Sequence, residues 1–166
     1  MAAEHVAEGE TGVADDEASQ RANLDVDSFV ARLHRLEKTV AERNMPLLSE
    51  QLQNMNPPAT GRDINQANEA VAPFRLPAWL EALYRWHNGS GYRGLNLDES
   101  GLRFMPLKEA VDQYGHLCAS WNGFGWYRRW SWPLLMADSD LLIATLDYAD
   151  NPPEPILCGF HMEDRP

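Results

Sequence analysis

LPAWLEALYRWHNG, residues 76–89, is the most informative stretch of this chain. Pro77 suits the first turn of a helix, because its missing N–H would have no intrahelical partner there. Asn88 and Gly89 tolerate the left-handed backbone conformation that commonly ends a helix. We therefore expect a short amphipathic core helix, with Glu81 and Arg85 facing solvent. Its apolar stripe is formed by residues at three- and four-residue spacing: Leu76, Trp79, Leu80, Leu83 and Trp86.

The chain before this helix divides into a tail, an extension and a linker, and the linker is residues 56–61, rich in Pro and Gly. Residues 1–23 are rich in Ala, Gly, Glu and Asp, a composition that predicts a disordered acidic tail. Residues 24–56 predict an amphipathic helical extension, which Asp25 or Asp27 could cap and which Pro46 interrupts or restarts. We expect this extension to pack on its own domain or, alternatively, on a second subunit. The apolar stripe of its helix comprises Val26, Phe29, Val30, Leu33, Leu36 and Val40.

The sequence after this helix predicts a sheet with one inserted helix. Residues 92–97 and 102–105 predict a hairpin, and Pro106 begins a helix with apolar residues Leu107, Ala110, Val111, Tyr114 and Leu117. Residues 132–137, 141–148 and 156–160 predict further strands. The expected fold class is α+β: a single domain over residues 61–166, with N-terminal helices followed by a mostly antiparallel sheet.

The order and spacing of four short motifs resemble the SUKH superfamily. Ile64, Ala67, Asn68 and Glu69 match its helix before the Leu-Pro pair, and residues 76–89 match its signature helix. Residues 102–110 match its strand followed by a Pro-Leu-x-Glu helix start, and residues 132–135 and 141–147 are similar to its closing strands. The superfamily includes fungal cell-wall assembly regulators and bacterial immunity proteins of polymorphic toxin systems. The resemblance implies a SUKH-like fold and a protein-binding function.

The net charge of the chain limits the classes of binding partner that we expect. A formal net charge of −11 would repel DNA, RNA and anionic membrane surfaces, so we expect neither nucleic acid nor a membrane as partner. A basic protein, such as a nuclease toxin domain, fits better, since an acidic inhibitor would be steered towards it. Two cysteines make no disulfide framework, and residues 1–5 do not resemble a signal peptide, which predicts a cytoplasmic protein.

An unusual segment, residues 121–132, combines tryptophan, tyrosine and arginine with two glycines. These residue types dominate protein-binding hot spots, because each buries a large area and keeps a polar group. Internal packing is the alternative, and Trp132 and Trp130 could both belong to the core. The acidic residues could imitate nucleic-acid phosphates. The predicted partner-binding residues are Trp121, Trp126, Tyr127, Arg128, Arg129, Asp98, Glu99, Asp138 and Asp140.

Catalysis and metal binding find little support in the sequence. His116, Cys118, Cys158 and His161 are suitable zinc ligands, but His116 and Cys118 are two apart on a predicted helix and point to different faces. The Asp138-Ser139-Asp140 run reads as a turn, and neither Ser90 nor His87 has an orienting catalytic partner. We therefore predict no enzyme activity, no cofactor and no metal.

The resemblance and the charge together favour an immunity protein that binds and neutralises a cognate nuclease-like toxin. The alternative is an intracellular regulator or scaffold of the cell-wall assembly type. Either function is compatible with a monomer, or with a weak homodimer formed through the N-terminal helix.

Overall fold

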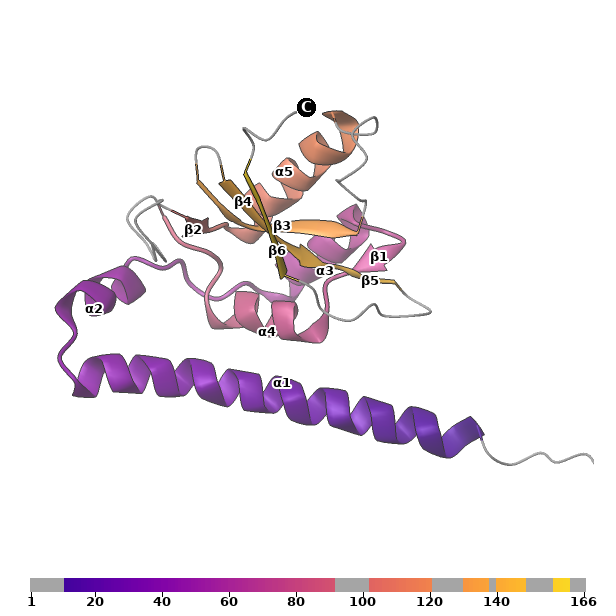
Figure 1. Cartoon of the computed structure of the whole chain (residues 1–166), viewed down its shortest axis with the longest axis horizontal. Coiled ribbons are helices and arrows are strands. Elements are labelled where there is room, and N and C mark those ends of the chain that lie inside the picture. The colour runs from indigo at the N-terminus through magenta and orange to yellow at the C-terminus, as the bar shows by residue number, and fades with distance from the viewer. Residues whose placement is uncertain (1–10, 92–101, 121–129, 138–139, 149–156, 162–166) are drawn as a thin grey trace, which may run out of the picture.

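The computed structural model describes residues 11–91, 102–120, 130–137, 140–148 and 157–161. In chain order, the elements within these residues are α1 (Thr11–Glu42), α2 (Pro46–Gln53), α3 (Gly61–Ala70), β1 (Phe74–Arg75), α4 (Ala78–Trp86), β2 (Arg103–Phe104), α5 (Leu107–Ser120), β3 (Ser131–Met136), β4 (Asp140–Thr145), β5 (Asp147–Tyr148) and β6 (Leu157–His161) (Figure 1). None of these helices has the length and apolar character needed to span a bilayer.

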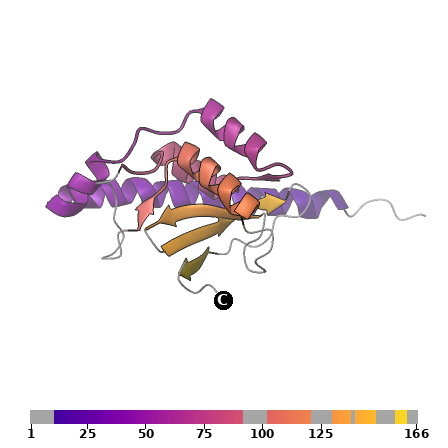
Figure 2. The ribbon, with the colours of Figure 1, turned by 90° about the horizontal axis from the view of Figure 1, so that it is seen from above.

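The strands form two antiparallel sheets. The larger sheet has the order β2-β3-β4-β6, and a small second sheet pairs β1 with β5. α5 is inserted between β2 and β3 in the chain and packs against α3 and β3 (Figure 2). The predicted α+β class, with helices first and one helix inserted in a mostly antiparallel sheet, is confirmed.

The helix predicted from residues 76–89 is α4, and it begins after Pro77 and ends at Trp86. Leu76 and Leu80 are fully buried, as their spacing predicted. Tyr84 is also completely buried, although it was not assigned to the apolar stripe. Glu81 does not simply face solvent, because its Oε1 accepts a hydrogen bond from Asn68 Nδ2 at 3.0 Å. α4 therefore contacts its neighbours through Glu81 and Tyr84 as well as through the predicted apolar stripe. The stripe alone does not predict these two contacts.

The centre of the core is a stack of aromatic rings. Trp132 of β3 is fully buried between Tyr84 of α4 and Tyr114 of α5, with ring centroids 6.4 Å and 6.1 Å away. Trp132 Nε1 donates a hydrogen bond to Tyr84 Oη at 3.1 Å, so the polar atoms of both rings are satisfied inside the core. Burial raises the pKa of Tyr84 far above its ordinary value and keeps the phenol neutral. This stack ties the sheet to the two helices that cover it.

The N-terminal helix starts earlier than expected. α1 runs from Thr11, so residues 11–23 of the predicted disordered tail are helical, and residues 1–10 lie outside the described part of the chain. Alanine, glutamate and glutamine are good helix formers, which accounts for the continuation. Asp25 and Asp27 consequently lie inside the helix and do not cap it. Pro46 starts a second helix, α2, one of the two outcomes expected for it.

α1 lies against α4 of its own chain. The ring of Phe29 meets that of Trp79 edge to face, with centroids 6.4 Å apart, and Glu37 Oε1 lies 3.3 Å from His87 Nε2. In Figure 1, α1 passes beneath α4 and its N-terminal part projects beyond the rest of the domain. The amphipathic extension thus covers one face of α4.

Candidate functional site

Most of the predicted partner-binding residues lie outside the described residues. Asp140 is the first residue of β4, and nothing is described of its side chain. The others stay predictions: Asp98, Glu99, Trp121, Trp126, Tyr127, Arg128, Arg129 and Asp138. The described residues that flank them nevertheless show where each segment attaches to the fold.

The two acidic segments attach at one end of the large sheet. Arg103, which follows residues 92–101, pairs with Met136, and Met136 pairs with Leu141, which follows residues 138–139 in the chain. The aromatic segment 121–129 joins the opposite end of β3, where Ser131 pairs with Thr145. Because a six-residue strand spans about 20 Å, the acidic and aromatic attachment points are well separated. The fold does not bring these points together at one end of the sheet.

The two tryptophans beside the aromatic segment have different environments. Trp132 is fully buried in the core, as its position in the strand predicted. Trp130 is 46% exposed, so the suggestion that it also belongs to the core is wrong. The alternation argument fails for Trp130 because β3 begins only at Ser131. Trp130 is therefore an exposed aromatic residue directly next to the predicted binding segment.

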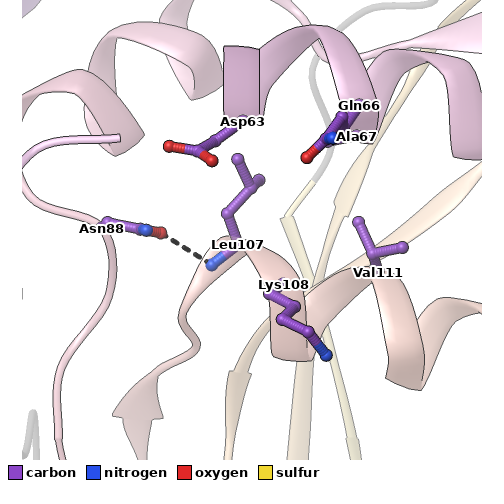
Figure 3. Close-up of a pocket in the computed structure, with 7 residues that line it drawn as sticks. All are labelled: Asp63, Gln66, Ala67, Asn88, Leu107, Lys108 and Val111. Atoms are coloured by element: carbon purple, nitrogen blue, oxygen red, sulfur yellow. Dashed lines mark hydrogen bonds between the residues drawn. The ribbon is translucent and has the colours of Figure 1, made fainter. Parts of the chain in front are cut away.

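A pocket of about 210 Å³ lies between α3 and the first turn of α5 (Figure 3). Asp63 and Gln66 of α3 face Leu107, Lys108 and Val111 of α5 across it. Ala67 and Asn88 complete the lining. No local sequence pattern indicates this pocket, because the two helices that form it are about forty residues apart in the chain.

The residues after α4 connect the separate parts of the domain. Asn88 Oδ1 accepts a hydrogen bond from the backbone N–H of Leu107 at 2.8 Å and so caps the beginning of α5. The carbonyl of Asn88 accepts another from Asn56 Nδ2 at 2.9 Å. Buried Ser90 donates from its N–H and its hydroxyl to the carbonyl of Phe104, at 2.8 and 3.2 Å. We call Asn88, Gly89 and Ser90 the 88–90 turn, and its role is structural.

Thr60 and Asp63 form a capping box at the beginning of α3. The hydroxyl of Thr60 accepts the backbone N–H of Asp63 at 3.2 Å, and Asp63 Oδ2 accepts the backbone N–H of Thr60 at 2.8 Å. The hydrogen bond from the Thr60 hydroxyl, followed by that from its N–H, lowers the pKa of Asp63 below its ordinary value of 3.8. The spacing Thr-x-x-Asp in residues 60–63 was a signal from which this helix start could have been predicted.

We expect Thr60→Ala to raise the pKa of Asp63, because the largest cause of its lowering is the Thr60 hydroxyl. An Asp whose pKa is lowered by folding stabilises the fold at pH above its unfolded pKa, and this contribution disappears as the pH falls through the folded pKa. Acidification below pH 3.8 should therefore remove the contribution in wild type. The check is a side-chain NMR titration. Thr60→Ser should keep the low pKa, and an unchanged pKa in Thr60→Ala would refute the assignment.

The residues considered for catalysis or metal binding do not form a catalytic or metal-binding cluster within the described residues. Ser90 is buried and hydrogen-bonded to the backbone. The nitrogens of His87 face oxygens of Asn56 and Glu37 at 3.1 and 3.3 Å. On α5, His116 is exposed and Cys118 is half-buried. In the described parts of the chain, no three His, Cys, Asp or Glu residues come together as a metal site. Asp63 is the one carboxylate lining the pocket and Lys108 the one amine.

The fold and the 88–90 turn define a small α+β domain built around a capped helix and an antiparallel sheet. A family model for the SMI1 / KNR4 family (SUKH-1) matches residues 58–165, so the chain belongs to this family. The match begins just before α3 and therefore excludes α1 and α2. A comparison with curated proteins found no match.

Proposed function

We propose that this protein is a cytoplasmic, non-catalytic immunity protein that binds and neutralises a cognate toxin, most specifically a basic nuclease. The observation that carries the proposal is membership of the SUKH-1 family over residues 58–165 in a chain with net charge −11. An acidic inhibitor attracts a basic enzyme at long range and competes with the nucleic acid that the enzyme binds.

The positions of the acidic segments support this proposal. The described residues next to segments 92–101 and 138–139 lie side by side, because Arg103 pairs with Met136. Arg103 itself is held in an ion pair with Glu109 in the first turn of α5, which fixes the beginning of β2. Asp98, Glu99, Asp138 and Asp140 belong to segments anchored in this region, so they are the proposed substitutes for phosphates.

The aromatic segment is the proposed source of binding energy. Trp126, Tyr127, Arg128 and Arg129 are joined to β3 through Trp130, whose side chain is 46% exposed. An exposed indole beside further aromatic and arginine residues is typical of the centre of a protein interface. Since the acidic and aromatic segments attach at opposite ends of β3, we expect a partner that contacts an extended surface.

Absence of catalysis is part of the proposal. A catalytic nucleophile or general base requires an orienting partner and access to substrate. Ser90 has no such access because it is fully buried. The pocket between α3 and α5 offers the carboxylate of Asp63, but that group already accepts hydrogen bonds from Thr60. These observations favour a binding function for the chain.

A regulator or scaffold is the second candidate, and α1 is the observation that favours it. α1 has 32 residues, corresponding to about 48 Å, and lies outside the region shared with the family. A long helix that projects beyond the domain could contact further proteins (Figure 1). This candidate predicts several partners of moderate affinity.

Affinity capture from the native lysate separates the two candidates. The baits are the wild-type chain, a Trp126→Ala/Arg128→Ala variant, and a matched control, Leu47→Ala/Arg62→Ala. Like the first variant, the control replaces one apolar residue and one arginine; Leu47 is 75% exposed and Arg62 is exposed. The proposal predicts one tight partner with a toxin-like domain, kept by the control and lost with the first variant. Several weak partners kept by all three baits would contradict it and favour the scaffold.

A further inference from the structure

α1 is an addition to the domain and not part of its core. The main hydrophobic cluster extends from Met55 to Leu146 and includes no residue of α1, either buried or packed against it. Within the described residues, the contacts of α1 are chiefly with α4 and α2. The family match also begins after α1, at residue 58. The domain can therefore be complete without the helix that covers α4.

The contact between α1 and α4 fully buries few side chains of α1. Among the described side chains of α1, residues 26–42, only Val40 is buried, at 3% exposure. Phe29, Val30 and Leu33 are half-buried, and Leu36 is 43% exposed. A helix held by so little buried apolar surface can detach at a low cost in free energy compared with unfolding of the domain.

The side of α4 that faces α1 has properties of a binding surface. The ring of Trp79 contacts Phe29 of α1, and Leu83 and Trp86 follow Trp79 on the same side of α4 at spacings of four and three residues. All three residues are half-buried and also pack against the main hydrophobic cluster. The Nε1 atoms of Trp79 and Trp86 are both buried without an acceptor among the described residues. A buried N–H without a partner carries a desolvation cost, so the two indoles on this side of α4 each have an unmet hydrogen bond. An occupant that supplies acceptors would fit it better.

The way in which α1 lies on this face shows what kind of occupant it accepts. α1 presents Phe29 to the ring of Trp79 and a carboxylate, Glu37, to Nε2 of His87. Nδ1 of His87 lies 3.1 Å from the carbonyl oxygen of Asn56, which orients the ring towards α1. The face thus accepts a helix with an apolar stripe and one acidic residue about two turns further along.

We propose that the face of α4 formed by Trp79, Leu83 and Trp86 is a docking surface for an amphipathic, acid-bearing helix of a partner protein, and that α1 covers this surface in the free chain. This surface uses none of the residues assigned to the proposed function. The proposal does not depend on a toxin, so its failure would leave the immunity function untouched.

The test uses a fluorescent peptide of residues 24–42 as the model helix, added to the full chain. In wild type, the attached α1 competes with the peptide at an effective concentration on the order of millimolar. Phe29→Ala/Leu33→Ala in the full chain should weaken that competition and increase the peptide affinity at least about 10-fold. Arg35→Ala, an exposed residue of α1 outside the apolar stripe, is the control and should behave as wild type.

Two further variants make the outcome decisive. Trp79→Ala, added to the Phe29→Ala/Leu33→Ala chain, should abolish peptide binding, and a peptide carrying Glu37→Gln should bind more weakly. Absence of peptide binding to a Phe29→Ala/Leu33→Ala chain that unfolds with a normal cooperative transition would overturn the proposal. Light scattering that shows a wild-type dimer dissociated by Phe29→Ala/Leu33→Ala would also overturn it, because the occupant would then be a second copy of this chain.

Discussion

Gly89→Ala is expected to lower the free energy of unfolding by about 3 kcal/mol or more, through backbone strain combined with a steric clash. Gly89 has a φ of +72°, a conformation that side chains rarely adopt. A Cβ at this position would also press against the backbone of Met105 and Pro106, which cannot rotate away. The substitution would therefore separate α4 from β2 and α5 at the point where the 88–90 turn joins them. Denaturant unfolding followed by circular dichroism provides the measurement.

Gly115→Ala is the matched control for this substitution. Gly115 lies within α5, and an added Cβ would meet nothing within 4 Å. Alanine is favoured over glycine inside a helix, so this variant should be stabilised by about 0.5–1 kcal/mol. If Gly89→Ala unfolded at the same denaturant concentration as wild type, the structural role of the 88–90 turn would be refuted.

Trp132→Ala is expected to cost about 3–5 kcal/mol, the range typical of removing a large aromatic side chain from a core. Trp132 is completely buried and packs against Tyr84 and Tyr114. Its removal would leave a cavity between the sheet and two helices and would also remove the hydrogen bond to Tyr84 Oη. Chemical denaturation should show a large decrease in the transition midpoint.

Trp130→Ala is the control for Trp132→Ala, because it removes a tryptophan side chain from the surface and not from the core. Trp130 is 46% exposed, and its carbonyl accepts the N–H of Leu146 at 2.7 Å, a backbone bond that alanine retains. We expect this variant to lose no more than about 1 kcal/mol, because it leaves the core intact. Equal losses for the two variants would mean that the division between core and surface at this strand is incorrect.

Much of the fold could be predicted from local patterns. The apolar spacing of α4 and α5 identified Leu80, Leu107, Ala110 and Leu117, all of which are buried. These predictions succeeded because helical periodicity and its end signals are local properties of the chain. The linker before α3 and the start of α2 at Pro46 follow from the same kind of signal.

The remaining features depend on contacts between distant residues. The burial of Tyr84 depends on its hydrogen-bond partner, Trp132, which lies 48 positions away. Asn88 caps a helix that begins 19 residues later. Trp79 packs against the core cluster, as its spacing predicts, but its ring also contacts Phe29 of α1, fifty positions earlier. Sequence spacing gives the faces of a helix and does not say which element covers each one.

For the candidate site, too, residue types could be predicted from the sequence but their arrangement could not. The sequence identified Trp126, Arg128, Asp98 and Asp138 from residue type alone, and the binding role of these residues stays a prediction. The register of the strands adds that the acidic segments attach at one end of β3 and the aromatic segment at the other. This separation could not be predicted because it depends on how β2, β3 and β4 pair.

The most direct test of the proposed function is a titration of the captured partner's nucleolytic activity with the wild-type chain. A tight inhibitor that occludes the active site predicts activity that falls linearly and reaches zero at one equivalent of the chain. The Leu47→Ala/Arg62→Ala control should inhibit equally well, and the Trp126→Ala/Arg128→Ala variant should not. Full activity in the saturated complex would contradict neutralisation and leave a binding role without inhibition.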